Sequence, residues 1–190
     1  MKDKTFETKF RRRREGKTNY KTRLALVKSK KVRIVVRKTG SSIIAQAIKY
    51  KPEGDVTIAS ANSKELDKMG FYGTNNTPSA YLTGYLLGKR MSEKEAILDI
   101  GMQRPSHGSV IFACLQGAID AGITIPHDKS AIPKEDRLNA TVLETFAKEH
   151  PEKFSVYEKK GIKVDAIAKA FEQTKATIDK VKQWIEKNQL

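Results

Sequence analysis

The residues best suited to chemistry in this chain are four consecutive arginines, Arg11–Arg14, near its amino terminus. Guanidinium groups donate charge-assisted hydrogen bonds to phosphates, release bound counterions and stack on unpaired bases. Phe10 and Tyr20 flank this run, and Phe6 precedes it. Because the unstacked bases of RNA lie well against aromatic rings, this mixture of cations and rings indicates an RNA-binding segment.

The positive charge of the chain is concentrated around the arginine run. The first 31 residues contain thirteen Lys and Arg and three acids, so they hold +10 of the net charge of +15. Residues 32–125 carry +3 and residues 126–190 carry +2, which leaves the rest of the chain almost balanced. A dense block of like charge repels itself and tends to stay unfolded until phosphates neutralise it. We therefore predict an extended basic arm over residues 1–31.

An arginine-rich segment is also compatible with a nuclear-import signal or a solvated tail. The aromatic residues among the cations, and the small charge of the rest of the chain, favour RNA over both alternatives.

Two loops, residues 71–76 and 103–109, add polar groups to this predicted RNA-binding surface. Each precedes a predicted helix, where free backbone N–H groups and the helix dipole favour phosphate. Either loop is also compatible with a simple helix-capping role, and for residues 103–109 the sequence favours neither interpretation. We expect both loops to lie at the ends of a sheet, where a crevice forms.

Motifs for catalysis are missing from the sequence. It has no Walker-type or dinucleotide-binding Gly loop, no His-Glu-x-x-His and no paired-Cys motif. Asp99, which we expect on a central strand, is the one carboxylate placed as a metal-dependent nuclease would need, but two-metal hydrolysis requires several acids. We therefore expect no enzyme activity, no catalytic residue, no cofactor and no metal site. A nuclease centred on Asp99 is the alternative function.

The single cysteine, Cys114, excludes an intramolecular disulfide and indicates a reducing, intracellular compartment. We expect it to be a small core residue. The amino terminus is charged, and no run approaches about 18 consecutive apolar residues. We therefore expect a soluble protein with no membrane partner.

The elements that position these groups follow from the spacing of apolar residues. Alternation with a period of two, interrupted by Gly-containing turns, predicts an antiparallel meander of three strands over residues 32–37, 43–48 and 56–61. Thr77, as the N-cap, and Pro78, as the first helical residue, then mark the start of a helix.

Helices and strands alternate after this meander. We predict a helix with one buried face over 80–91, a strand covered on both faces over 95–101, a second helix over 109–121 and a short last strand over 123–126. Crossovers between parallel strands need helices packed on the sheet. The pattern therefore predicts an α/β core domain with a mixed sheet over residues 32–126.

Residues 127–190 form a predicted C-terminal helical extension. Residues 138–150 are weakly helical, and Pro151 ends that helix. Apolar steps of three and four residues from 164 to 187 predict an amphipathic helix, with Trp184 beside its apolar stripe. The stripe is expected to dock on its own domain or on a neighbouring protein, since a free coiled coil needs more heptads. A protein whose main role is interaction through this helix is a third hypothesis.

Seven segments together resemble the archaeal form of the large-subunit ribosomal protein L eighteen family, whose eukaryotic relatives are named L five. The similarity runs from about residue 6 to about residue 137, and residues 138–190 resemble the longer tail of some archaeal members. The segments are Phe10–Tyr20, Val35–Lys38, Ile44–Gln46, Asn76–Gly84, Ala96–Gly101, Ile125–His127 and Ile132–Arg137.

The resemblance implies a structural protein of the large ribosomal subunit, in the cytoplasm, with the α/β fold predicted above. It implies binding to 5S ribosomal RNA and attachment of that RNA to the large-subunit RNA in the central protuberance, beside neighbouring ribosomal proteins. It also implies that the basic arm is the main RNA contact. The residues expected to bind RNA are Phe10, Arg11, Arg12, Arg13, Arg14, Lys17, Tyr20, Lys21, Arg23, Arg37, Lys38, Tyr72, Asn75, Asn76, Arg104 and His107.

Overall fold

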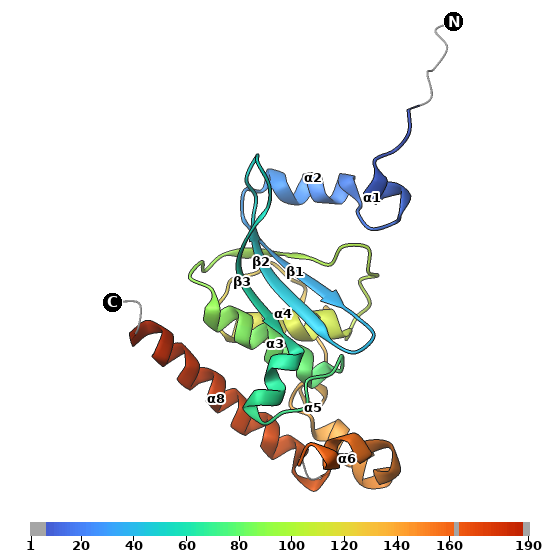
Figure 1. Ribbon diagram of the computed structural model, residues 1–190, viewed down its shortest axis with the longest axis vertical. Helices are drawn as coiled ribbons and strands as arrows, with labels where there is room; N and C mark the ends of the chain where they lie inside the picture. The colour runs from blue at the N-terminus through green and yellow to red at the C-terminus, as the bar shows by residue number, and fades with distance from the viewer. Residues whose placement is uncertain (1–6, 162–163, 188–190) are drawn as a thin grey trace, which may run out of the picture.

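A four-stranded mixed sheet organises the computed structural model, which describes residues 7–161 and 164–187 of the chain (Figure 1). The strand order is β3-β2-β1-β4. β1 pairs antiparallel with β2 and parallel with β4, and β2 pairs antiparallel with β3. The predicted α/β class and the antiparallel meander are therefore confirmed. The strands are β1 (Val32–Lys38), β2 (Ile43–Lys49), β3 (Val56–Asn62) and β4 (Ala96–Asp99).

Two helices, α3 (Thr77–Arg90) and α4 (Val110–Asp120), cover one face of the sheet (Figure 1). Ile34 and Val36 of β1 are fully buried in the same hydrophobic cluster as these helices. Cys114 lies in that cluster, where burial raises the pKa of its thiol to about 12, so its predicted core role is confirmed.

Helix α3 begins one residue earlier than the sequence suggested and is more deeply buried. Asn76 is its N-cap and accepts a hydrogen bond from the Ser79 N–H at 2.9 Å, so Thr77 and Pro78 occupy the first two helical positions. Every residue from Thr77 to Gly88 is buried. The prediction of a single buried face is wrong because the sheet, α4 and the C-terminal helix all pack around α3.

Two glycines let α3 and α4 approach closely. A Cβ added to Gly84 would lie 1.9 Å from the carbonyl oxygen of Cys114, and one added to Gly117 would lie 2.0 Å from that of Tyr81. Both distances are far inside van der Waals contact. The spacing of the two helices therefore depends on the absence of side chains at these positions.

Strand β4 differs from its prediction in position. It lies at the edge of the sheet, so Asp99 is not on a central strand. The predicted strand over residues 123–126 is reduced to one parallel bridge between Glu95 and Thr124. Pro126 has no N–H group to donate, so it cannot extend this pairing.

The basic arm contains two helices where an extended segment was predicted: α1 (Arg11–Arg14) and α2 (Tyr20–Lys28). Local contacts account for them. Glu15 forms ion pairs with Arg11 at 2.7 Å and Lys17 at 2.8 Å, and these two partners hold the pKa of Glu15 below its usual value. Asn19 caps α2 by accepting hydrogen bonds from two backbone N–H groups. Neither helix has a buried residue.

The C-terminal extension folds back along α3 (Figure 1). The predicted helix over 138–150 is divided between α5 and α6 at Ala140, whose φ is +69°. The remaining elements, with the short helix η1 that follows β3, are η1 (Ser63–Met69), η2 (Lys129–Ala131), α5 (Glu135–Leu138), α6 (Thr141–Glu149), η3 (Pro151–Phe154), α7 (Ser155–Lys159), η4 (Val164–Ala166) and α8 (Ile167–Lys187).

The apolar stripe of α8 packs on its own domain. Ile167, Phe171, Thr174 and Ile178 are buried, and the Phe171 ring lies 5.6 Å from that of Tyr81 in α3. Over this part of the helix, the stripe is not free for a partner protein. The structure does not describe the side chains of Val164, Val181 and Ile185, which were predicted to belong to the same stripe, or that of Trp184 beside it. No described helix has the length and apolar character needed to cross a membrane.

Candidate nucleic-acid interface

The sheet face opposite the helices, called the open face below, carries charged and polar side chains. Arg33, Val35 and Arg37 alternate along β1 with Ile34 and Val36, which lie in the hydrophobic core, so they project to this opposite face. The strand register places Gln46 of β2 on one side of Val35 and Asp99 of β4 on the other. These five residues form one contiguous surface across three strands.

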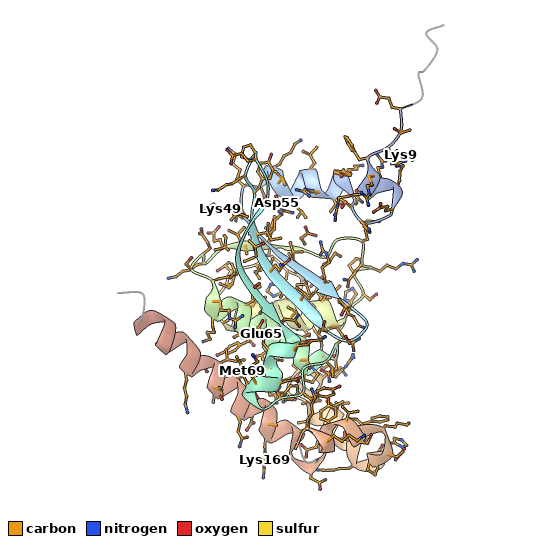
Figure 2. The ribbon with its side chains drawn as sticks, in the orientation of Figure 1. Lys9, Lys49, Asp55, Glu65, Met69 and Lys169 are labelled. Carbon is orange, nitrogen blue, oxygen red and sulfur yellow. The ribbon has the colours of Figure 1, made fainter. Side chains whose placement is uncertain are left out.

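A chain of ion pairs connects the arm with this face. The Arg33 guanidinium lies 2.8 Å from an Asp55 oxygen and 3.3 Å from an Asp99 oxygen, although Arg33 is only 3% exposed. Asp55 also pairs with Arg23 of α2 at 2.8 Å, and Asp99 pairs with Arg37 at 3.1 Å. Figure 2 shows Asp55 beside the arm, in the turn between β2 and β3. The two carboxylates therefore hold three guanidiniums between the arm and the sheet.

A cavity of about 250 Å³ lies between the arm and the open face. Cations outnumber acids five to two in its lining, so its charge is positive. The arm contributes Arg12, Lys17, Thr18, Asn19, Thr22, Arg23 and Leu26. The body of the protein contributes Arg33, Val35, Arg37, Gln46, Ile48, Asp55, Asp99 and Gly101.

Asp99 does not have the surroundings that the nuclease alternative requires. Its oxygens accept hydrogen bonds from the guanidiniums of Arg33 and Arg37 and from the Gly101 N–H at 2.9 Å. Within residues 7–161 and 164–187, no group of three His, Cys, Asp or Glu residues could hold a metal ion. Asp99 thus orients two arginines, and the structure gives no support for a nuclease.

The Asp99→Ala variant tests this structural role. We expect the free energy of unfolding to fall by about 3 kcal/mol, because Arg33 stays buried with only one remaining carboxylate partner. Asp136→Ala is the matched control, since Asp136 is exposed on α5, and it should change stability by no more than about 0.5 kcal/mol. Urea denaturation measures both. Equal stabilities of the Asp99→Ala variant and the wild-type protein would contradict the role of Asp99.

The predicted arm residues divide into two groups. Arg12, Lys17 and Arg23 line the cavity, and the Nε atom of Arg12 donates to the Thr18 hydroxyl at 2.8 Å. The others lie on the outer surface or, like Tyr20, are half-buried. Phe10 is 72% exposed, with its ring 5.2 Å from that of Tyr20.

Three exposed arm cations, Arg13, Arg14 and Lys21, have no side-chain partner among the described residues. Arg37 lines the cavity, and Lys38 is exposed at the end of β1. These residues present donors where the arm and the open face meet.

The predicted RNA-binding side chains of the loop over residues 71–76 contact other parts of the same protein. The Tyr72 ring lies 4.9 Å from that of Tyr157 and 4.1 Å from the Lys160 ammonium. The Asn76 side chain caps α3 and donates to the Tyr157 hydroxyl at 3.2 Å. Asn75 donates to two carbonyls of the β1–β2 turn. The capping alternative therefore describes Asn76, and RNA contacts of all three predicted residues stay predictions.

The second predicted loop leaves its basic groups more accessible. Arg104 is exposed, and His107 is exposed with its Nδ1 atom 3.0 Å from the carbonyl oxygen of Ser130. The contact of these two residues with RNA also stays a prediction. They are far from the arm in sequence, and neither lines the cavity.

Three residues of the interface were not among the RNA-binding residues predicted from the sequence: Arg33, Gln46 and Asp55. The signal for Arg33 was present, because an arginine two or four residues from another polar position in a strand faces the same side. Gln46 follows the same alternation in β2. Asp55 left no such signal, since its role depends on where the β2–β3 turn meets α2.

The fold and the site define a basic α/β protein whose arm and open sheet face form one polyanion-binding surface. The family model described as "Ribosomal large subunit proteins 60S L5, and 50S L18" matches residues 4–96 and 92–128. The "Large ribosomal subunit protein uL18" of Korarchaeum cryptofilum (strain OPF8) is 48% identical over 177 residues, which cover 88% of this chain and 91% of that protein.

The chain therefore belongs to the L5/L18 family of large-subunit ribosomal proteins, and the resemblance seen in its sequence is confirmed. This is a family of structural, RNA-binding proteins of translation, and not of enzymes. Its members act in the large ribosomal subunit in the cytoplasm.

Proposed function

We propose that this chain binds 5S ribosomal RNA and helps attach it to the large-subunit ribosomal RNA in the central protuberance, next to other ribosomal proteins. The observation that carries the proposal is the positive cavity between the arm and the open face. It combines cations with an amide and apolar side chains, so it suits an irregular, partly unpaired RNA better than a uniform duplex.

The arm and the body have different roles in this proposal. The arm holds +10 of the net charge of +15 and buries no side chain in α1 or α2, so its cations are available to phosphates. The body is nearly neutral and fixes where the arm is attached, through the ion pair of Arg23 with Asp55.

A truncated protein that lacks residues 1–23 tests the proposal. We expect its affinity for 5S ribosomal RNA to fall by at least about 100-fold and its dependence on salt to weaken, since ten Lys and Arg are lost. Mobility shifts at several salt concentrations, with transfer RNA as competitor, measure both quantities. Because the deleted segment has no buried residue in α1 or α2, the thermal unfolding midpoint should show a folded body.

Unchanged affinity together with an unchanged salt slope would overturn the role of the arm. Binding of the full chain to transfer RNA as tightly as to 5S ribosomal RNA would overturn the choice of 5S RNA.

A further inference from the structure

The cavity between the arm and the open face has the size of a site for one small group. Its volume of about 250 Å³ lies below the roughly 300–1,000 Å³ of pockets that hold drug-sized ligands. It cannot admit a helix of RNA, but a single flat group fits. Leu26 of the arm contributes apolar surface on one side, and Val35 and Ile48 of the sheet contribute it on the other.

Most cations of the cavity are already paired with carboxylates, so a phosphate would gain less there than the positive net charge of the lining suggests. The Asp55 and Asp99 carboxylates line it and would repel an anion. Three of its five cations, Arg23, Arg33 and Arg37, are already paired with these carboxylates. An apolar surface also offers nothing to a phosphate, whereas the flat face of a nucleobase gains by contact with it.

Two hydrogen-bonding groups of the cavity have no partner among the described residues. One is the side-chain amide of Gln46, which is half-buried in β2. The other is the Nε–H of Arg33, in a residue that is 3% exposed. A buried donor such as the Arg33 Nε–H normally has a partner, and the half-buried Gln46 amide is free to bind a group that enters the cavity.

An amide that offers one donor and one acceptor side by side matches the edge of a base. Glutamine binds adenine in this two-point manner, through the N6 amino group and N7. Arginine planes such as those of Arg33 and Arg37 also stack on unpaired bases. The chemistry of the lining thus favours a base over any charged group.

We propose that the cavity receives one unstacked base of the bound RNA, with adenine the best match to the Gln46 amide. The flanking phosphates then lie on the arm side, within reach of Arg12 and Lys17. Entry requires the arm to move, which its lack of buried residues in α1 and α2 permits. This inference rests on the proposed binding of 5S ribosomal RNA and specifies one subsite of it.

The Gln46→Met variant tests the base subsite in the full chain. Methionine keeps the length and the neutral charge of glutamine but removes the amide. We expect binding to a 5S ribosomal RNA transcript to weaken about tenfold with an unchanged salt slope, because a base contact and no phosphate contact is lost. Probing with diethyl pyrocarbonate, which reacts at N7 of unstacked adenines, should show one adenine that the wild-type protein protects and the variant leaves reactive.

Gln173→Met is the matched control, since Gln173 is exposed on α8, and it should bind and protect the RNA as the wild-type protein does. Circular dichroism melting of each variant shows whether it is folded. Wild-type affinity and protection in Gln46→Met would overturn the base subsite while leaving the proposed function intact. A smaller salt slope in Gln46→Met would also overturn it, in favour of a phosphate. Failure of the wild-type protein to prefer 5S ribosomal RNA would instead refute the proposed function.

Discussion

Replacing Arg11, Arg12, Arg13 and Arg14 together with glutamine is expected to weaken binding to 5S ribosomal RNA by about 100- to 1,000-fold at physiological salt. Each guanidinium that neutralises a phosphate contributes about 0.7 to 0.9 to the slope of log affinity against log salt, so the slope should fall by about 3. Glutamine is a good helix former, which partly offsets the Arg11–Glu15 ion pair that α1 loses. Filter binding over a series of salt concentrations measures both effects.

A matched control removes the same charge elsewhere. Lysines 134, 159, 169 and 180 are exposed in the C-terminal extension, and their joint replacement by glutamine also removes four positive charges. Screening at physiological salt confines most of a surface charge's effect to about 8 Å, so this control should bind nearly as the wild-type protein does. An equal loss in the two variants would show that net charge, and not the arm, sets the affinity.

Substitution of Gly117 by alanine is expected to lower the free energy of unfolding by about 3 kcal/mol or more. The added Cβ would lie 2.0 Å from the carbonyl oxygen of Tyr81 and 2.8 Å from the backbone nitrogen of Tyr85, and backbone atoms of a packed helix cannot rotate away. The sign of this change in stability is informative. At an open position inside a helix, alanine stabilises the protein by roughly 0.5–1 kcal/mol relative to glycine, so a loss of stability indicates the steric clash. Urea denaturation measures the change.

Gly40→Ala is the control for this substitution. A Cβ at Gly40 would meet nothing within 4 Å, and its backbone angle is ordinary, so we expect a change within about 0.5 kcal/mol. A Gly117→Ala protein as stable as the wild type would show that α3 and α4 can separate without cost. The close helix contact would then have no role in stability.

The sheet was predictable because apolar residues recur with a period of two along its strands. Ile34 and Val36 alternate with Arg33 and Arg37, and that period of two identified both the strand and its polar face. The period of two does not specify the order of the strands in the sheet. The edge position of β4 and the loss of the strand over 123–126 depend on which backbones pair, and no single strand's pattern specifies its neighbours.

The candidate interface was predictable in its charge but not in its geometry. The dense cations of the arm are visible in composition alone, whereas the helices α1 and α2 depend on the side chains of Glu15 and Asn19. The junction of Arg23, Asp55 and Arg33 needs the β2–β3 turn to meet the arm, and Asp55 is 32 positions from Arg23 and 22 from Arg33. Tertiary contacts of this kind leave no periodic trace in the sequence.

The packing of α8 on α3 has a consequence for synthesis of the chain. Lys175 donates to the Tyr81 hydroxyl across 94 positions of sequence, and Phe171 covers the same ring. A nascent chain therefore presents the apolar side of α3, with Tyr81 and Tyr85, to solvent until residues 167–178 have emerged. Incomplete chains with exposed apolar surface are prone to aggregate. The body of this protein thus reaches its final packing only late in translation.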